Sequence, residues 1–337
     1  MNIIPGKKVT KSHLSLLQKI NPLNKDIEKE KFFFDTSYNP QFEYEEDTSF
    51  EELETYGKVS DKYVGEAKKI IDQVIKTYGT ETNYLEQVEG KLLSQDESVA
   101  AIEKYLQENG LENTVELSFS SNFISRTSVK KIDNRFQLQI RLPTEYREHA
   151  LQGTLDHEIG THVFRWINEL EQPWSERKSK FKLTNHLLTE EGMAALHTFL
   201  SRQNKYLWLY ALYYYSVYLG NTLSFSQLFR ALQPYIDDKE RRWRHCLRVK
   251  RGLKDTSLPL VFTKDQVYFL GVLEVFKWLK AHTFDPTLLY LGKISIHDIP
   301  KLEKISKHSV ILPKFAQDKK FYRENIEKII KINHLEL

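Results

Sequence analysis

Two histidines and a glutamate lie close together in the stretch LDHEIGTHVFRW, residues 155–166. Imidazole nitrogens and carboxylate oxygens are common protein ligands of Zn²⁺. A glutamate beside such an ion can also move a proton as a general base and then as a general acid. His157, Glu158 and His162 are therefore candidates for a hydrolytic metal site, with the two histidines as ligands and Glu158 as the catalytic carboxylate.

The spacing of this motif is H-E-x-x-x-H, one residue longer than the familiar H-E-x-x-H. Five residues advance about 500° around an α-helix, so the two imidazoles would diverge by roughly 140° on a regular helix. A π-bulge absorbs one extra residue and returns such a pair to one face. We therefore predict a π-bulge near Gly160, whose missing side chain would let the backbone distort. A regular α-helix over residues 157–162 would contradict the metal site.

The next helical stretch, LLTEEGMAALHTF at residues 187–199, offers the third ligand. Glu191 shares a predicted helix face with Ala194 and Ala195, whose small side chains allow another helix to approach closely. Glu190 belongs to a different face, which makes Glu191 the preferred ligand. Alternatively, both carboxylates only stabilise the positive end of the helix dipole.

The elements that must position these residues are mainly helices. The segments VELSFSSNFISRTS and FQLQIRL alternate apolar and polar residues, as strands do, and KKIDNR between them resembles a turn. Helical periodicity dominates before Gly110 and after Pro143. The predicted fold class is mainly α with a small antiparallel β-sheet (α+β), with residues 1–59 as an N-terminal arm packed on a body of residues 60–337. The strand ending in QIRLP is expected beside the metal helix, as a substrate-pairing edge strand or as part of an ordinary hairpin.

Composition indicates a globular protein: 40% of the 337 residues are hydrophobic, and the net charge is +3 from 49 basic and 46 acidic residues. Binding to an acidic partner would thus depend on local clusters rather than on total charge. The single cysteine, Cys246, excludes an internal disulfide, and MNIIPGKKVTK lacks the apolar core of a secretory signal. Residues 206–220 are too short to span a membrane and are expected to form a buried helix. We expect a cytoplasmic protein. Neither a membrane nor a nucleic acid is an expected partner.

Several stretches together resemble one known family: HEIGTHVFRWINELEQPW, TEEGMAALH, LRVKRG, FTKDQVYFLG and NPQFEY. The chain resembles the microtubule-associated tyrosine carboxypeptidases of eukaryotes and their bacterial relatives with a Q-E-G-L-P motif, from about residue 36 to about residue 300. This resemblance implies a zincin-like metallopeptidase with one Zn²⁺ per chain and two lobes around the site. It implies that His157, His162 and Glu191 bind the metal and that Glu158 is catalytic. The T-E-E-G-M-A sequence lies nearer to the eukaryotic branch.

Substrate contacts are expected from donors and cations near the metal. The hydroxyl of Tyr268 is a candidate donor to a developing oxyanion. A carboxypeptidase must also hold a free carboxylate, which arginine and lysine do well. The most basic run is ERRWRHCLRVKRGLK, residues 240–254, although such a run is more often a solvated helix face or an RNA-binding patch. The candidates are Arg248, Lys250, Arg251, Lys264 and Arg126, whereas Arg165 is expected to brace the metal helix.

The leading hypothesis is a zinc carboxypeptidase that removes a C-terminal, tyrosine-like residue from an acidic protein or peptide tail such as that of α-tubulin. One alternative is a non-catalytic protein whose basic face binds an acidic partner. Another is a metallohydrolase with a different substrate.

Overall fold

The computed structural model describes residues 14–133, 135–307 and 309–335, and most of this chain is helical. The helices are α1 (Leu16–Lys19), α2 (Lys25–Phe34), α3 (Phe50–Leu53), α4 (Val64–Tyr78), α5 (Glu81–Tyr84), α6 (Gln95–Glu108), α7 (Leu151–His157), α8 (Phe164–Leu170), α9 (Leu187–His197), α10 (Trp208–Gly220), α11 (Phe225–Ala231), α12 (Lys239–Lys250), α13 (Gln266–Ala281), α14 (Ile299–Leu302), α15 (Lys314–Gln317) and α16 (Lys319–Ile332). Two π-helical segments are η1 (Leu85–Glu89) and η2 (Glu158–Val163), and the 3-10 turns are η3 (Thr263–Asp265), η4 (Thr287–Tyr290) and η5 (Glu303–Ile305). The mainly helical α+β prediction is confirmed.

The small sheet has three strands in the order β1–β3–β2: β1 (Val115–Ser120), β2 (Thr127–Ile132) and β3 (Arg135–Arg141). β2 and β3 form an antiparallel hairpin, but β1 runs parallel to β3. The expectation of an antiparallel sheet was therefore wrong for one of the two pairings. Alternation predicts strands but not their neighbours. The centre is taken by β3, whose apolar residues Phe136, Leu138 and Ile140 are all buried.

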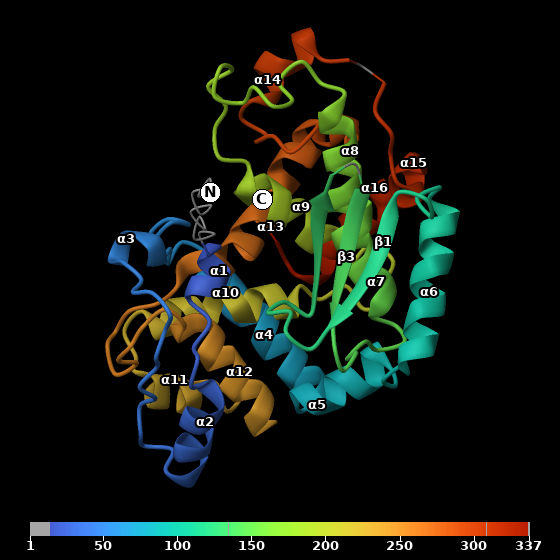
Figure 1. Cartoon of the computed structure of the whole chain (residues 1–337). Coiled ribbons are helices and arrows are strands. Elements are labelled where there is room, and N and C mark those ends of the chain that lie inside the picture. Colours follow the sequence, from blue (N-terminus) through green and yellow to red (C-terminus); the bar gives the residue numbers. More distant parts are fainter. Residues whose placement is uncertain (1–13, 134, 308, 336–337) are drawn as a thin grey trace, which may run out of the picture.

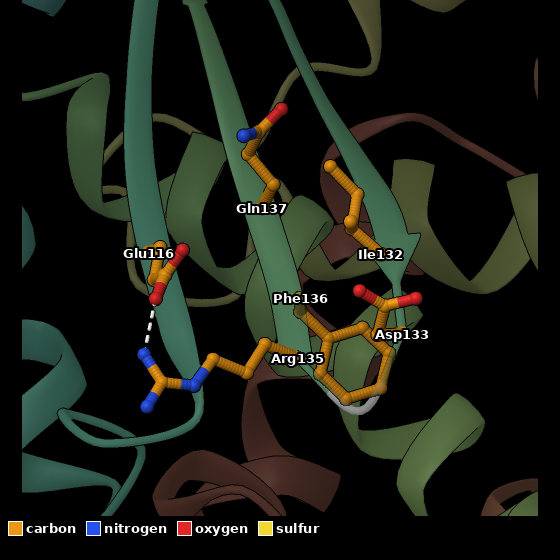
Figure 2. A pocket seen from close by; sticks show the side chains of 6 residues that line it. All are labelled: Glu116, Ile132, Asp133, Arg135, Phe136 and Gln137. Carbon is orange, nitrogen blue, oxygen red and sulfur yellow. Dashed lines mark hydrogen bonds and ion pairs between the residues drawn. The ribbon is translucent and has the colours of Figure 1, made fainter.

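One end of the sheet, at the start of β3, carries a shallow hollow (Figure 2). Glu116 on β1 and Arg135 on β3 form an ion pair there, and Phe136 lies next to the turn that joins β2 and β3. The hollow is lined by residues of the strands and their turn and contains none of the predicted site residues. It therefore does not bear on the candidate site.

The sheet lies beside the continuous helix formed by α7, η2 and α8, with β2 packed against η2 (Figure 1). On the other side of η2 lies α9, which packs in turn against α13. Gly192 on α9 and Gly271 on α13 meet where these two helices cross, and a Cβ on either glycine would collide with the backbone of the other helix. This close crossing brings the start of α13 next to the T-E-E-G segment of α9.

The N-terminal segment packs on the body through aromatic side chains. Phe32 on α2 is fully buried and contacts Phe225, Phe229 and Trp243 of the α11–α12 region. Helix α10, which contains most of the apolar stretch at 206–220, is largely buried between α4 and α13, as expected. No helix in the described residues is both long and apolar enough to cross a membrane.

Candidate metal centre

The predicted π-bulge is confirmed. Residues Glu158–Val163 form the π-helical segment η2, and the N–H of Phe164 donates to the carbonyl of Ile159, five residues earlier. Gly160 lies inside this segment, as expected, with a φ outside the left-handed region. A Cβ on Gly160 would lie 2.5 Å from the Phe315 ring and 2.7 Å from the Tyr105 hydroxyl. Glycine is needed there for the space that it leaves to its neighbours.

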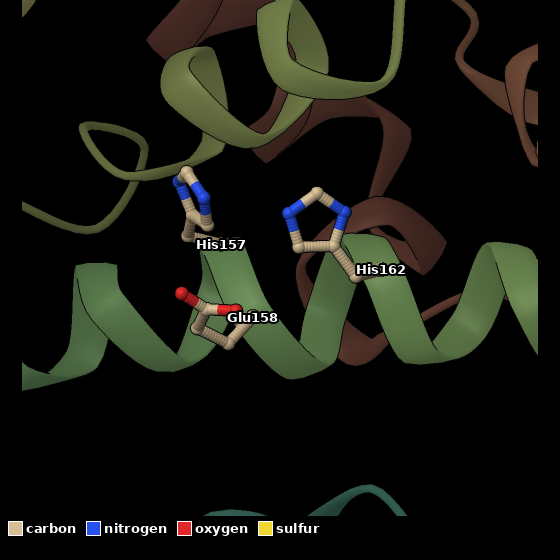
Figure 3. Close-up of side chains that lie close together, drawn as sticks. All are labelled: His157, Glu158 and His162. Carbon is tan, nitrogen blue, oxygen red and sulfur yellow. The ribbon is translucent and has the colours of Figure 1, made fainter. Parts of the chain in front are cut away.

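The π turn places the two histidines on one side of the helix, as Figure 3 shows. Their ring centroids are 5.1 Å apart. Glu191, from α9, directs Oε2 toward both rings and lies 3.9 Å from Nε2 of His157 and 3.9 Å from Nε2 of His162. Tetrahedral zinc with bonds of about 2.0–2.1 Å needs ligand atoms about 3.4 Å apart. Glu191 Oε2 thus lies about half an ångström beyond that spacing from each Nε2 atom.

A buried carboxylate lies behind His162. Glu190 Oε1 is 2.6 Å from His162 Nδ1 and 3.0 Å from Lys293 Nζ, and its other oxygen pairs with the fully buried Arg165. Arg165 also donates to the carbonyls of Leu289 and Ile294, so it braces the helix as expected. Burial raises the pKa of Glu190, but Lys293 and Arg165 outweigh it and hold that pKa well below its usual value.

This arrangement orients His162. A carboxylate that accepts from one ring nitrogen leaves the other nitrogen free as a metal ligand and increases its basicity. The sequence reasoning missed this role, because Glu190 was considered only as a rival to Glu191. An adjacent glutamate on a different helix face, together with a buried arginine on the metal helix, is the signal that could have indicated it.

His157 is oriented by hydroxyl groups. Its Nδ1 lies 3.2 Å from Thr198 Oγ1 and 3.3 Å from the hydroxyl of Tyr210. Thr198 donates its own proton to the carbonyl of Ala194, so its oxygen can accept from Nδ1–H. Burial lowers the pKa of His157 well below its usual value, and the neighbouring His162 lowers it further. A neutral imidazole with Nε2 unprotonated is the form that binds metals.

Glu158 begins η2, and a carboxylate oxygen lies within 4.8 Å of ligand nitrogens on both histidines. Two carboxylates thus approach the imidazoles. Glu191 is the better ligand because one oxygen faces both Nε2 atoms at 3.9 Å from a separate helix. Burial raises the pKa of Glu158 to about 7, with His162 opposing the rise and Glu191 adding to it. Such a carboxyl is suited to proton transfer near neutral pH.

Three predicted basic residues gather beside Glu191. Lys264 Nζ lies 3.8 Å from Glu191 Oε1. Arg248 forms an ion pair with the buried Asp265, and its guanidinium covers the Tyr213 ring at 4.4 Å. Burial raises the pKa of Asp265, but the pKa is lowered overall by the positive charges of Arg248, Arg251 and Lys264. Because Lys264 also pairs with Glu191, three cations lie near two carboxylates on this side of the site.

Lys250 does not belong to this group, so its predicted role as a substrate contact needs correction. Its side chain is fully buried, and its ammonium donates at 2.8 Å to each of the carbonyls of Gly220, Leu258 and Leu260. All three N–H groups are therefore used inside the protein. Burial lowers the pKa of Lys250 to about 7. The sequence could not distinguish this lysine from its neighbours because only the fold decides which face of α12 is covered.

Other members of the basic run on α12 also have partners within the chain. Arg241 pairs with the buried Glu81 at 2.8 Å, Arg244 lies 3.8 Å from Glu145, and Arg242 covers the Phe229 ring at 4.2 Å. The run is thus not a uniformly solvated basic face. This arrangement argues against an RNA-binding patch on α12.

Tyr268 and Arg126 come from different elements, Tyr268 from α13 and Arg126 from the segment before β2. Tyr268, near the start of α13, is buried and stacks on Tyr210 with ring centroids 5.4 Å apart. Burial raises the pKa of Tyr268 well above its usual value, and the charge of Glu191 adds to this shift, so the phenol stays protonated and can donate. Arg126 is exposed just before β2, and its positive charge lowers the pKa of Glu158.

The strand beside the metal helix is not the expected one. β3, which contains QIR, pairs on both sides and has no free edge. The edge strand that packs against η2 is β2. Any extended peptide paired to the sheet near the histidines would therefore have to add to β2.

The site has the donor set of a metallohydrolase. It combines two histidines on one helix face, a carboxylate from a second helix and a carboxyl suited to proton transfer. Comparisons with known proteins give the family. The family model described as "Microtubule-associated tyrosine carboxypeptidase" matches residues 45–333. The chain belongs to this family.

Individual relatives agree with this assignment. A putative tyrosine carboxypeptidase, MATCAP2 of Mus musculus, is 35% identical over 334 residues, which cover 98% of this chain and 64% of the relative. Microtubule-associated tyrosine carboxypeptidase 1 of Homo sapiens is 37% identical over 328 residues, which cover 95% of this chain and 69% of the relative. The matched region thus spans about two thirds of the length of these relatives.

Proposed function

We propose that this protein is a zinc-dependent carboxypeptidase that removes a C-terminal, tyrosine-like residue from an acidic protein tail such as that of α-tubulin. The observation that carries the proposal is the approach of Glu191 Oε2 to Nε2 of both His157 and His162, 3.9 Å from each. The names of the relatives, tyrosine carboxypeptidases associated with microtubules, support the choice of reaction and substrate. Association with microtubules also favours a cytoplasmic location.

In this proposal one Zn²⁺ is held by His157, His162 and Glu191, and it would supply a more acidic water and polarise the scissile carbonyl. Glu158 takes a proton from the attacking water on its carboxylate and returns it to the leaving amine. Its raised pKa would fall when a cation is bound nearby, which makes the carboxylate available as a base. Tyr268 donates its phenolic hydrogen to the oxyanion that develops on the carbonyl.

The excess positive charge beside Glu191 would recognise the end of the substrate chain. Lys264, Arg248 and Arg251 lie around Asp265, and Lys264 also pairs with Glu191, so three cations face two carboxylates. Arg248 keeps about a third of its side chain exposed, at 32%. A terminal carboxylate can accept charge-assisted hydrogen bonds from such groups, whereas a chain that continues past this point carries no charge there. This difference would make the cut specific for the C-terminus.

The rest of the tail would lie along β2. The outer edge of this strand is unpaired in the sheet, and an extended peptide can add to such an edge through main-chain hydrogen bonds. Two exposed cations, Arg126 and Lys130, lie at or next to the strand. They favour glutamate-rich substrates through electrostatic attraction.

The test uses a peptide ending in Glu-Glu-Tyr, wild-type protein and the Glu158→Gln variant. We expect the variant to retain about one Zn²⁺ per chain by elemental analysis and to lose cleavage, because an amide cannot accept the proton. The matched control is the same peptide with an amidated C-terminus, which the wild type should leave intact. Full activity of Glu158→Gln would refute the mechanism, and cleavage of the amidated peptide would refute carboxypeptidase specificity.

The non-catalytic alternative makes a different prediction for metal content. A protein that only binds an acidic partner needs no zinc, so a purified chain prepared without chelators would carry less than about 0.1 Zn²⁺ per molecule. A metallohydrolase acting on another substrate would instead carry the metal and leave the Glu-Glu-Tyr peptide uncut.

A further inference from the structure

A chain of buried hydrogen bonds connects the C-terminal helix α16 to the π turn of the metal helix. Tyr322 on α16 lies with its hydroxyl 2.9 Å from Nε2 of His197 on α9. Nδ1 of His197 is 2.7 Å from Thr161 Oγ1 in η2, and this hydroxyl donates to the carbonyl of Asp156 at 2.8 Å. Tyr322, His197 and Thr161 are all fully buried.

The direction of each proton in this chain follows from counting donors. Thr161 has one hydroxyl hydrogen, which it gives to the Asp156 carbonyl, so its oxygen accepts from Nδ1–H of His197. A neutral imidazole then has a lone pair on Nε2, and Tyr322 donates to it. The hydrogen bonds are therefore all donated in one direction, from the phenol of Tyr322 to the backbone of the metal helix.

The last two groups of this hydrogen-bond chain belong to the residues directly before the two histidines. Asp156 directly precedes His157, and Thr161 directly precedes His162. The Thr161 hydroxyl thus ties together, across five residues, the two backbone positions next to the proposed ligands. A second hydroxyl, that of Tyr290, donates at 2.8 Å to the carbonyl of Gly160 inside the same π turn. A π turn is less favourable than an α-helix, so such external hydrogen bonds are needed to hold it.

We propose that Thr161, His197 and Tyr322 are positioning residues that keep the metal helix in its π form, so that helix α16 sets the affinity of the site for its cation. This inference rests on the proposed function, because it assumes that His157 and His162 bind a metal. None of the three residues would touch the cation or the substrate.

The first test measures Zn²⁺ affinity by competition with a chelator. Thr161→Val keeps the shape of the side chain but removes the hydroxyl, and we expect it to weaken binding about 10–100-fold, the effect typical of residues that orient ligands. Thr161→Ser should restore nearly wild-type affinity. For Tyr322→Phe, at the far end of the chain, we expect a loss of about tenfold.

Tyr214→Phe is a matched control for Tyr322→Phe. Tyr214 is also buried, at 1% exposure, and its hydroxyl donates to the carbonyl of Ser60 at 2.7 Å, away from the metal helix. It should lose stability and keep its Zn²⁺ affinity. Equal Zn²⁺ affinities for the wild type and Thr161→Val would refute this inference alone. A wild-type chain that binds no Zn²⁺ would refute the metal site as well.

The second test needs no metal. Nitrogen-15 NMR of the imidazole side chains in the metal-free protein, assigned with a His197→Gln variant, should show His197 as the Nδ1–H tautomer. An Nε2–H tautomer would reverse the hydrogen-bond chain and overturn the inference, whatever the metal content of the protein.

Discussion

Replacing Glu190 by glutamine should weaken both the fold and the metal site. The change preserves the shape of the side chain but removes the negative charge between Arg165, Lys293 and His162. Breaking a buried ion pair by neutralising one partner typically costs about 3–5 kcal/mol. We expect the lower end, about 3 kcal/mol, because Arg165 still donates to two backbone carbonyls.

This loss can be converted into a change of melting temperature. An unfolding entropy of about 2.1 cal/mol/K per residue, for a chain of 337 residues, gives about 0.7 kcal/mol/K. A loss of about 3 kcal/mol at the midpoint then lowers Tm by about 4 °C. Removal of the partner of His162 Nδ1 should also weaken Zn²⁺ binding about 10–100-fold.

The pH dependence gives a further check on Glu190→Gln. The folded protein holds the pKa of Glu190 well below its ordinary value of 4.5. The charged carboxylate therefore contributes its stability above about pH 4.5 and loses it as the pH falls through the lowered pKa. The difference in stability between wild type and Glu190→Gln should therefore narrow in acid.

The assay combines calorimetry with chelator competition, and Glu169→Gln serves as a control. Glu169 is also largely buried, but it pairs at 2.9 Å with Lys178, whose side chain is 34% exposed. Its Oε2 also accepts from the N–H of Lys293 at 2.7 Å, a bond that the amide oxygen of glutamine can still accept. Loss of such a partly exposed pair should cost less than about 1 kcal/mol and leave Zn²⁺ affinity unchanged. If Glu190→Gln matched wild type in both Tm and affinity, the role given to Glu190 in orienting His162 would be refuted.

Three further predictions concern the packing and charge of the site. Gly192→Ala should lower stability by about 1–3 kcal/mol or prevent folding, because the added Cβ meets the backbone of Gly271. The control Gly65→Ala, in open space on α4, should be neutral or stabilising, and thermal unfolding measures both. Lys250→Met should lower Tm, because it leaves three carbonyls unpaired. It should leave kcat/KM of the folded protein unchanged. A large rise in KM would contradict the structural role given to Lys250. In metal-free protein the raised pKa of Glu158 means that its protonated form stabilises the folded state. The free energy of unfolding, measured by urea titration, should therefore fall as the pH rises from about 4.5 to about 7. In Glu158→Gln this free energy should depend less on pH.

Local patterns allowed much of the site to be predicted. The distance between His157 and His162 required a π turn, because helical geometry relates spacing to direction. Face analysis of the T-E-E-G segment also separated Glu191 from Glu190, and the structure directs only Glu191 at both Nε2 atoms. The π turn is present as predicted, whereas Glu191 as a metal ligand stays a prediction. Both inferences depend on residues in one helix, whose relative directions follow from the sequence.

Contacts between distant segments could not be predicted in this way. Nothing local to β1 indicates that β3 would lie beside it in parallel, which left β2 as the edge next to the metal helix. Lys250 and Arg248 lie on the same short basic helix, yet one is enclosed by carbonyls and the other partly faces solvent beside the site.

The sequence by itself therefore determined the candidate ligands, their spacing and the helical turn that this spacing requires. The tertiary structure decided which carboxylate orients His162, which cations reach the site and which strand edge is free. It also decided that Thr161 is connected through His197 to Tyr322. His197 and Tyr322 are 125 positions apart in the sequence. The physical reason is that side-chain direction within a helix is local, whereas burial and pairing depend on segments that meet only after the whole chain has folded.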